Sequence, residues 1–184
     1  MHPVSLNAED LPRYTYKDYA VWEGGWEIIR GIPYAMVPAP VIKHQRLSKK
    51  IAWQLEEQLE YCEKCEVFLP VDWQVSEDTV VQPDVLVVCS EDDYVGDVKL
   101  EITPVIVFEV LSPASSRKDR IVKYRLYESA GVKYYCIVDP GTNSADVFVL
   151  QKEKYRELED FDEGLMSFDL GPCRVQLDFG EIFR

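Results

Sequence analysis

The sequence has few histidines, no long apolar run and fewer basic than acidic side chains. Its only histidines are His2 and His44, and its five cysteines are an odd number, which argues against the disulfide framework of a secreted protein. No apolar run reaches the roughly 18 residues that a membrane span requires. Residues 1–11 also lack the apolar core of a signal peptide. We therefore expect a cytoplasmic protein without a membrane segment.

Positive charge is scarce, because 20 Lys and Arg stand against 33 Asp and Glu and leave a formal net charge of −13. Proteins that hold nucleic acid by its phosphates are usually basic, so this balance argues against such a partner. Basic residues nevertheless gather at 43–50 and 117–125, which predicts local positive patches on an acidic body. The side chains that we expect to contact phosphate are Lys43, Arg46, Arg117, Lys118 and Arg120.

Cysteine spacing offers only half of a metal motif. Cys62 and Cys65 form C-E-K-C, the spacing of one zinc knuckle. No second C-x-x-C follows and histidines are few, so we expect no zinc site there. Cys89 and Cys136 lie inside apolar runs and are predicted to be small core residues.

The order of helix and strand patterns predicts one domain over residues 1–184, of class α/β (α+β), with helices packed on a mixed sheet. Residues 44–60 form the clearest helix, with Leu and Ile at steps of four on one face. A second helix, 115–130, ends at Gly131. A short helix is expected at 15–22, loops at 91–102 and 160–164, and strands at 26–30, 32–37, 66–75, 80–90, 105–112, 134–138, 145–151, 154–159 and near 173–183.

Two near-continuous apolar runs each carry one carboxylate. Asp84 lies in V-V-Q-P-D-V-L-V-V-C, and Glu109 lies in P-V-I-V-F-E-V-L-S-P. Acids are almost never fully buried without a partner, and one shared divalent cation is the simplest partner for both. Two simpler interpretations remain open, a turn aspartate at Asp84 and a structural ion pair between Glu109 and Lys123.

These motifs together carry a resemblance to a known family. The ordered set P-D, E-V-L-S-P, a basic helix and Y-Y-C-I-V-D-P resembles the Uma2 (DUF820) family of the restriction-endonuclease-like, PD-(D/E)xK superfamily. Three further segments agree with the family pattern: W-E-I-I-R-G at 26–31, H-Q at 44–45 and A-G-V-K-Y-Y at 130–135. The resemblance therefore covers about residues 14–155. It implies a restriction-endonuclease-like fold, a central mixed β-sheet flanked by helices, with the acids on adjacent strands.

The resemblance also implies a catalytic site. Asp84 and Glu109 would be the ligands of Mg²⁺ or Mn²⁺, which takes hard oxygen ligands and assists phosphodiester hydrolysis. The superfamily pattern places a lysine two residues after the second acid, where this sequence has Leu111. Lys123, on the following helix, is the candidate for a migrated catalytic lysine, and an exposed helical lysine is the alternative.

Four further residues are predicted to support the site. Gln82 is two residues before the first acid and would share its face on a regular strand. Asp119 is one helical turn before the candidate lysine and would orient it. Glu27 would be a third acid if its strand packs as the resemblance implies. His44, at the start of the long helix, is placed to touch the scissile phosphate, although a surface or structural histidine is the simpler interpretation.

The sequence therefore favours a metal-dependent endonuclease that hydrolyses phosphodiester bonds, with DNA as the expected partner. The alternative is a nuclease-fold binding module or dimeric scaffold without turnover, which the acidic charge favours and the retained acids disfavour. A third interpretation is a nuclease that acts only with a basic partner protein. A homodimer is one expected assembly.

Overall fold

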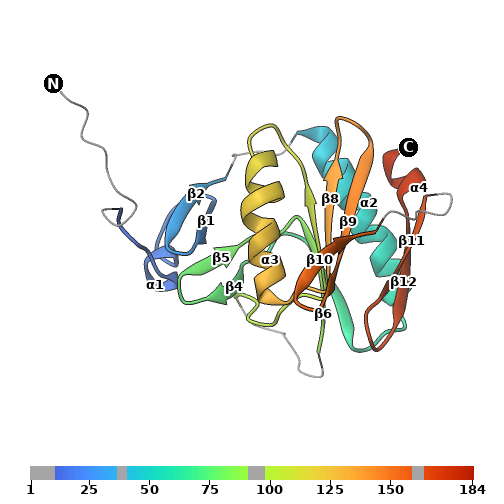
Figure 1. Ribbon diagram of the computed structural model, residues 1–184, viewed down its shortest axis with the longest axis horizontal. Coiled ribbons are helices and arrows are strands. Elements are labelled where there is room, and N and C mark those ends of the chain that lie inside the picture. Colours follow the sequence, from blue (N-terminus) through green and yellow to red (C-terminus); the bar gives the residue numbers. More distant parts are fainter. Residues whose placement is uncertain (1–10, 37–40, 91–97, 159–163) are drawn as a thin grey trace.

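The computed structural model describes residues 11–36, 41–90, 98–158 and 164–184 (Figure 1). At its centre lies a six-stranded sheet of order β10-β9-β8-β7-β6-β3, in which β7 and β8 are parallel and the other neighbours antiparallel. The strands are β3 (Cys65–Phe68), β6 (Val85–Cys89), β7 (Ile106–Val110), β8 (Tyr134–Asp139), β9 (Ser144–Gln151) and β10 (Lys154–Glu157). This confirms the predicted central mixed sheet.

Two smaller sheets flank the central one (Figure 1). The N-terminal sheet has the order β2-β1-β5-β4 and consists of β1 (Trp26–Ile29), β2 (Ile32–Ala35), β4 (Trp73–Ser76) and β5 (Thr79–Val81). The C-terminal hairpin pairs β11 (Leu165–Asp169) with β12 (Arg174–Asp178). The sequence patterns did not predict β11.

Helices cover both faces of the central sheet (Figure 1). The helical elements are α1 (Tyr16–Tyr19), α2 (Ile42–Leu59), the π-helical turn η2 (Lys118–Lys123), α3 (Tyr124–Ala130) and α4 (Phe179–Phe183). The apolar stripe of α2 is buried, as predicted, and packs in one core with Phe108. Leu126 of α3 packs in a second core with Val107. Successive residues of a strand face opposite sides, so Glu109 faces α3, as Val107 does.

Two predicted strands prove to be divided between sheets. The stretch 66–75 supplies β3 to the central sheet and β4 to the N-terminal sheet, and 80–90 supplies β5 and then β6. Pro83 lies in the second break, where a residue without an N–H loses no ladder hydrogen bond. Gln82 and Asp84 therefore do not lie on one regular strand, and that argument for placing Gln82 at the site is wrong.

Two disulfides correct the expectation drawn from the odd cysteine count. Cys62 is bonded to Cys173 and Cys65 to Cys89, so Cys89 is not a simple core residue, whereas Cys136 is free and buried as predicted. The partners are 111 and 24 residues apart, a proximity that only the folded chain reveals. In the described part of the chain, no helix combines the length and the apolar character that crossing a membrane requires. The predictions for 1–11 and for the loops at 91–102 and 160–164 lie wholly or partly outside the described residues.

Candidate active site

Glu109 and Lys123 form the centre of a buried polar cluster between β7 and the helix that follows it. Both side chains are almost fully buried, at 4% and 3% exposure. One oxygen of Glu109, Oε1, accepts hydrogen bonds from Lys123 Nζ at 2.7 Å and from the Tyr127 hydroxyl at 2.7 Å. The structure thus brings together the second predicted acid and the predicted lysine, which are 14 residues apart in the chain.

Glu27, from β1 of the N-terminal sheet, joins the same cluster and is fully buried. Its Oε1 lies 2.7 Å from Lys123 Nζ and accepts the Gln82 backbone N–H at 3.0 Å. Its Oε2 forms an ion pair with Lys118. Burial would raise the pKa of Glu27, but the charges of Lys123 and Lys118 together lower it.

The helix predicted at 115–130 contains the π-helical turn η2, and this turn places Asp119 inside the protein. In the π-helical pattern the Asp119 carbonyl accepts the N–H of Tyr124, five residues later. The same carbonyl also accepts the Tyr135 hydroxyl at 3.1 Å. The Asp119 side chain is 1% exposed, and neither carboxylate oxygen has a hydrogen-bond partner among the described residues. Its Oδ1 lies 3.9 Å from Lys123 Nζ, one turn later on the same face.

Asp84 approaches the cluster from the break between β5 and β6. Its Oδ2 accepts the backbone N–H of Val110 at 2.7 Å, which holds it beside Glu109 on the neighbouring strand. His44, near the start of α2, places Nε2 3.2 Å from the same oxygen. Burial alone would lower the pKa of His44, but the Asp84 carboxylate raises it above the ordinary value. His44 is therefore a partly buried partner of an acid rather than a surface residue.

Burial and charge shift the central pKa values in opposite ways. Burial raises the pKa of Glu109 well above its ordinary value. The Lys123 ammonium lowers this pKa in part, and the carboxylates of Asp119, Asp84 and Glu27 raise it further. Burial would lower the pKa of Lys123, but Glu109, Glu27 and Asp119 raise it well above its ordinary value. The ammonium therefore keeps its proton, and Glu109 holds a proton more tightly than an ordinary carboxyl does even with Lys123 beside it.

The cluster holds more acids than bases. The acids are Glu27, Asp84, Glu109 and Asp119, and the bases are Lys118, Lys123 and His44. Among the described residues, no three of these acids bring oxygens within 4.8 Å of one another. A hard cation held by two carboxylates and completed by water fits this arrangement, because Mg²⁺ usually keeps several waters. The unpartnered oxygens of buried Asp119 are suited to accept hydrogen bonds from such waters.

Some predicted site residues lie elsewhere. The Gln82 side chain donates to Asp72 Oδ1 at 2.6 Å, outside the cluster, and only its backbone N–H reaches Glu27. Lys43 binds the Pro140 carbonyl and Asn143 Oδ1.

Of the remaining predicted phosphate contacts, two form ion pairs within the described part of the chain and two do not. Arg120 pairs with Asp146 at 2.5 Å and with Asp139 at 3.6 Å, and Lys118 is committed to the buried acid Glu27. Arg46 and Arg117 are exposed. Of the five predicted phosphate contacts, these two alone make no hydrogen bond or ion pair among the described residues, which leaves them available for phosphate.

Sequence reasoning missed Tyr127, whose hydroxyl binds the central acid. Its place four residues after Lys123 is the signal that would have found it, because residues at that spacing share a helix face. Asp119, Lys123 and Tyr127 follow one another at this spacing and are all buried. The inward face of the helix therefore carries these polar side chains beside the apolar ones of Val122, Leu126 and Ala130, which pack against the second core.

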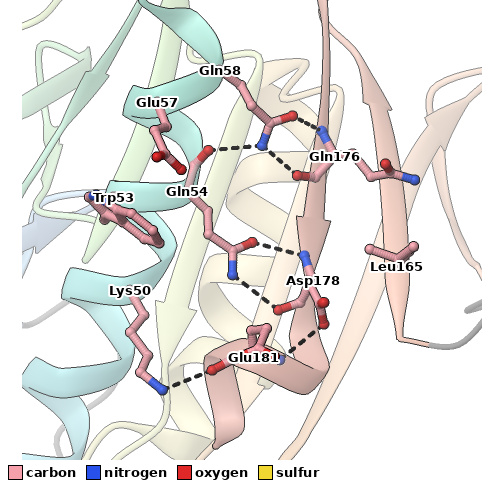
Figure 2. A pocket seen from close by; sticks show the side chains of 9 residues that line it. All are labelled: Lys50, Trp53, Gln54, Glu57, Gln58, Leu165, Gln176, Asp178 and Glu181. Carbon is pink, nitrogen blue, oxygen red and sulfur yellow. Dashed lines mark hydrogen bonds between the residues drawn. The ribbon is translucent and has the colours of Figure 1, made fainter.

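A cavity of about 550 Å³ lies apart from the cluster, between α2 and the C-terminal hairpin (Figure 2). Its wall includes exposed Trp53 and the side chains of Gln54 and Gln58, which hydrogen-bond to the backbone of β12. None of the four acids lines it. The chemistry of the buried cluster, rather than the shape of this cavity, identifies the candidate site.

Comparison with known proteins agrees with the fold and the motifs. A crystal structure from Anabaena variabilis, described as a "putative nuclease belonging to DUF820", matches with a TM-score of 0.75 at 17% identity, covering 92% of this chain and 97% of that one. At this identity the match shows the fold, and it confirms the predicted class. No curated protein matches this chain. The model of the Uma2 family, described as "Putative restriction endonuclease", matches residues 16–179. Because that match spans most of its length, the chain belongs to the Uma2 family.

Proposed function

We propose that this chain is a metal-dependent nuclease that hydrolyses phosphodiester bonds in DNA. The observation that carries the proposal is the buried surplus of carboxylates around Lys123, in which both oxygens of Asp119 lack a hydrogen-bond partner among the described residues. A structural ion pair would need one acid for one lysine, whereas four acids face three bases here, an excess that a proton on Glu109 or a bound metal ion would neutralise. The description of the Uma2 family supports the same class of activity.

Asp84 and Glu109 are the residues that would hold Mg²⁺ or Mn²⁺. When bound, the metal supplies positive charge to the phosphate and lowers the pKa of a coordinated water. Because burial raises the pKa of Glu109, a proton competes with the metal for this carboxylate. Metal affinity should therefore rise with pH.

Lys123 would act by charge and hydrogen bonding rather than as a base. Its raised pKa keeps it protonated. An ammonium has three donors, and Glu109 and Glu27 occupy two of them. The third donor is left for the attacking water or a phosphate oxygen. His44, whose raised pKa favours the imidazolium, can donate to the phosphate from the other side of Asp84.

Cleavage assays with supercoiled DNA, single-stranded DNA and RNA, each with Mg²⁺, Mn²⁺ or EDTA, test the proposal. We expect DNA to be cut only when metal is present. Glu109→Gln should fold, since Lys123 keeps Glu27, but should lose cleavage and metal binding. In wild type, metal at about 100 times its Kd should stabilise the fold by about 2.7 kcal/mol. This thermal shift should vanish in Glu109→Gln.

Lys123→Ala should cut DNA about 100- to 1000-fold more slowly while still binding Mn²⁺, because lysine is not a ligand. The change strands two buried acids at a cost of about 3–5 kcal/mol, so circular dichroism must show that the variant is folded. Lys154→Ala, which removes an exposed lysine paired with Glu128, is the matched control and should cleave normally. Wild-type activity in Glu109→Gln or in folded Lys123→Ala would show that the site lies elsewhere.

A binding protein of nuclease fold without turnover is the second candidate. It is favoured by the engagement of Lys43, Lys118 and Arg120 in contacts within the protein, which leaves few cations for DNA. The cleavage and metal-binding assays distinguish the nuclease from this binding protein. Metal binding without cleavage of any substrate, accompanied by a DNA mobility shift, would establish the second candidate.

A further inference from the structure

Four of the five cysteines converge beyond the C-terminal end of α2. Cys62 lies on the turn between α2 and β3, Cys65 begins β3, Cys89 ends β6, and Cys173 lies in the turn of the C-terminal hairpin. Cys89 lies five residues after Asp84 along β6, so this centre is about 17 Å from the carboxylate cluster. It is therefore a separate feature of the molecule.

The sulfur atoms are closer together than two independent disulfides require. The Sγ atoms of Cys62, Cys65 and Cys173 all lie within 4.8 Å of one another. Cys65 Sγ and Cys173 Sγ are 3.6 Å apart although they are not bonded to each other. Cys89 is bonded to Cys65, so its sulfur belongs to the same group. Four thiolates around one Zn²⁺, each at about 2.3 Å, would lie about 3.8 Å from one another.

Local backbone geometry also suits a metal. The Cys65 N–H donates to the Cys62 carbonyl at 3.2 Å, which closes the C-E-K-C turn and directs both thiols to one side. Cys65 and Cys89 are direct partners on neighbouring strands, which brings their side chains to the same place. Cys62, Cys89 and Cys173 are only partly buried, so an ion can enter from solvent.

We propose that Cys62, Cys65, Cys89 and Cys173 form a tetrathiolate site for one Zn²⁺, and that the two disulfides are its oxidised, metal-free form. Sequence spacing argued against zinc because it showed only the first pair. Folding supplies the other two ligands from strands far along the chain. In the reducing cytoplasm that the sequence predicts, the cysteines would be thiols and the metal form would prevail.

Conversion of the disulfide form to the zinc form requires reduction and then loss of protons. A dithiol reductant opens each disulfide by thiol–disulfide exchange, so two equivalents deliver four electrons and four protons and are themselves oxidised to disulfides. Zn²⁺ then displaces the four thiol protons and binds four thiolates, with a net charge of two minus. Oxidation by a peroxide or a disulfide reverses the process and releases the metal.

In either form the centre joins the C-terminal hairpin to the central sheet. Cys173 belongs to the hairpin, Cys89 to β6, and the C-E-K-C turn follows α2. The contacts with the hairpin run in order along α2, from Gln54 with the Asp178 carbonyl and Gln58 with the Gln176 carbonyl to the Cys62–Cys173 link just after the helix. The zinc form would therefore keep this hairpin docked when no disulfide exists.

Cobalt substitution tests the proposal on the full-length protein. The chain is reduced with a phosphine, freed of metal without oxygen and titrated with Co²⁺, then Zn²⁺. We expect one Co²⁺ per chain to give the visible bands of tetrahedral cobalt and a near-ultraviolet thiolate charge-transfer band, and one Zn²⁺ to displace them. Any Co²⁺ bound at the carboxylate cluster would give no charge-transfer band. Zn²⁺ should also raise the melting temperature of the reduced protein. Absence of the charge-transfer band in reduced, folded wild type would overturn the proposal.

Matched variants identify the ligands. Cys89→Ser and Cys173→Ser should each weaken Co²⁺ binding and diminish the charge-transfer band, because each removes one thiolate. Cys136→Ser, which changes the buried free cysteine, and Glu109→Gln, which changes the distant cluster, should retain the full signal. Equal binding by Cys89→Ser, Cys173→Ser and wild type would overturn the assignment. Because wild type is measured first, misfolding of one variant leaves the test intact.

Discussion

At the scale of a single residue, Lys123 is the cation that three buried acids of the candidate site share. It is buried and lies within 3.9 Å of carboxylate oxygens of Glu27, Glu109 and Asp119. Removing one partner of a buried charge pair is expensive, because the other charge stays desolvated. The residue therefore serves both folding and the proposed chemistry, and only variants whose folded state is verified can separate the two roles.

Glu128, on the same helical segment, shows how a more exposed acid contributes. Its carboxylate pairs with Lys154 at 2.8 Å and accepts the Tyr155 N–H at 2.9 Å, and these contacts lower its pKa. A lowered folded-state pKa gives stability that is present above the unfolded value of 4.5 and lost as pH falls through the folded value. Glu128→Gln should therefore be less stable than wild type at neutral pH, and the difference should shrink in acid.

Urea unfolding at a series of pH values measures this difference. Glu157→Gln, which changes an exposed acid on β10, is the control and should follow the wild-type profile. A constant gap between Glu128→Gln and wild type from neutral pH down to the acid range would contradict the assignment.

At the scale of elements, one helix and one strand are joined by paired amide side chains (Figure 2). Gln58 donates to the Gln176 carbonyl at 2.6 Å and accepts the Gln176 N–H at 2.7 Å. Gln54 makes the same pair of bonds with Asp178. The two glutamines lie one helical turn apart and their partners two residues apart on β12, so α2 satisfies the edge of this strand as a neighbouring strand would.

Gln58→Leu should loosen the C-terminal hairpin. It removes two hydrogen bonds from β12, each worth about 0.5–1.5 kcal/mol, so we expect a loss of about 1–3 kcal/mol in the free energy of unfolding. Hydrogen exchange is the more direct measurement, because the Gln176 amide should lose protection. Glu57→Leu, on the exposed surface of the same helix, should leave that amide protected. Equal protection of the Gln176 amide in both variants would show that the hydrogen bonds from Gln58 contribute little to holding the hairpin.

At the scale of the whole molecule, an acidic body must approach an acidic substrate. The net charge is −13, and among the described residues only Arg46 and Arg117 of the predicted phosphate contacts are exposed and make no hydrogen bond or ion pair within the protein. DNA binding should therefore be weak without a divalent cation and should depend only modestly on salt. Each phosphate contact contributes about 0.9 to the slope of log K against log salt.

Replacing Arg46 and Arg117 together by alanine should reduce that slope by about 2. The measurement is fluorescence anisotropy with a DNA duplex in Ca²⁺, a cation chosen to allow binding without rapid cleavage. The double variant Arg156→Ala/Arg174→Ala removes the same charge from other exposed positions and is the matched control. If both double variants reduce the slope equally, net charge rather than a specific contact governs binding.

Local pattern was enough to predict much of the architecture. The steps of four in α2 predicted its buried stripe, because apolar spacing alone selects the face that leaves water. The apolar runs around Asp84 and Glu109 predicted covered strands of the central sheet, and their isolated acids signalled a polar site between them. The motifs also indicated the Uma2 family, which the family model confirms.

Only the tertiary structure decided the partners of those acids and of the cysteines. Glu27 reaches Lys123 because β1 packs over the central sheet, a contact between residues 96 positions apart that no local pattern encodes. Asp119 turns inward because of a π-helical turn, whose sequence resembles an ordinary helix. Cys62 meets Cys173 only when the C-terminal hairpin docks on α2. The sequence by itself determined which segments bury their side chains, since burial follows local periodicity, and long-range packing determined which buried charges and thiols meet.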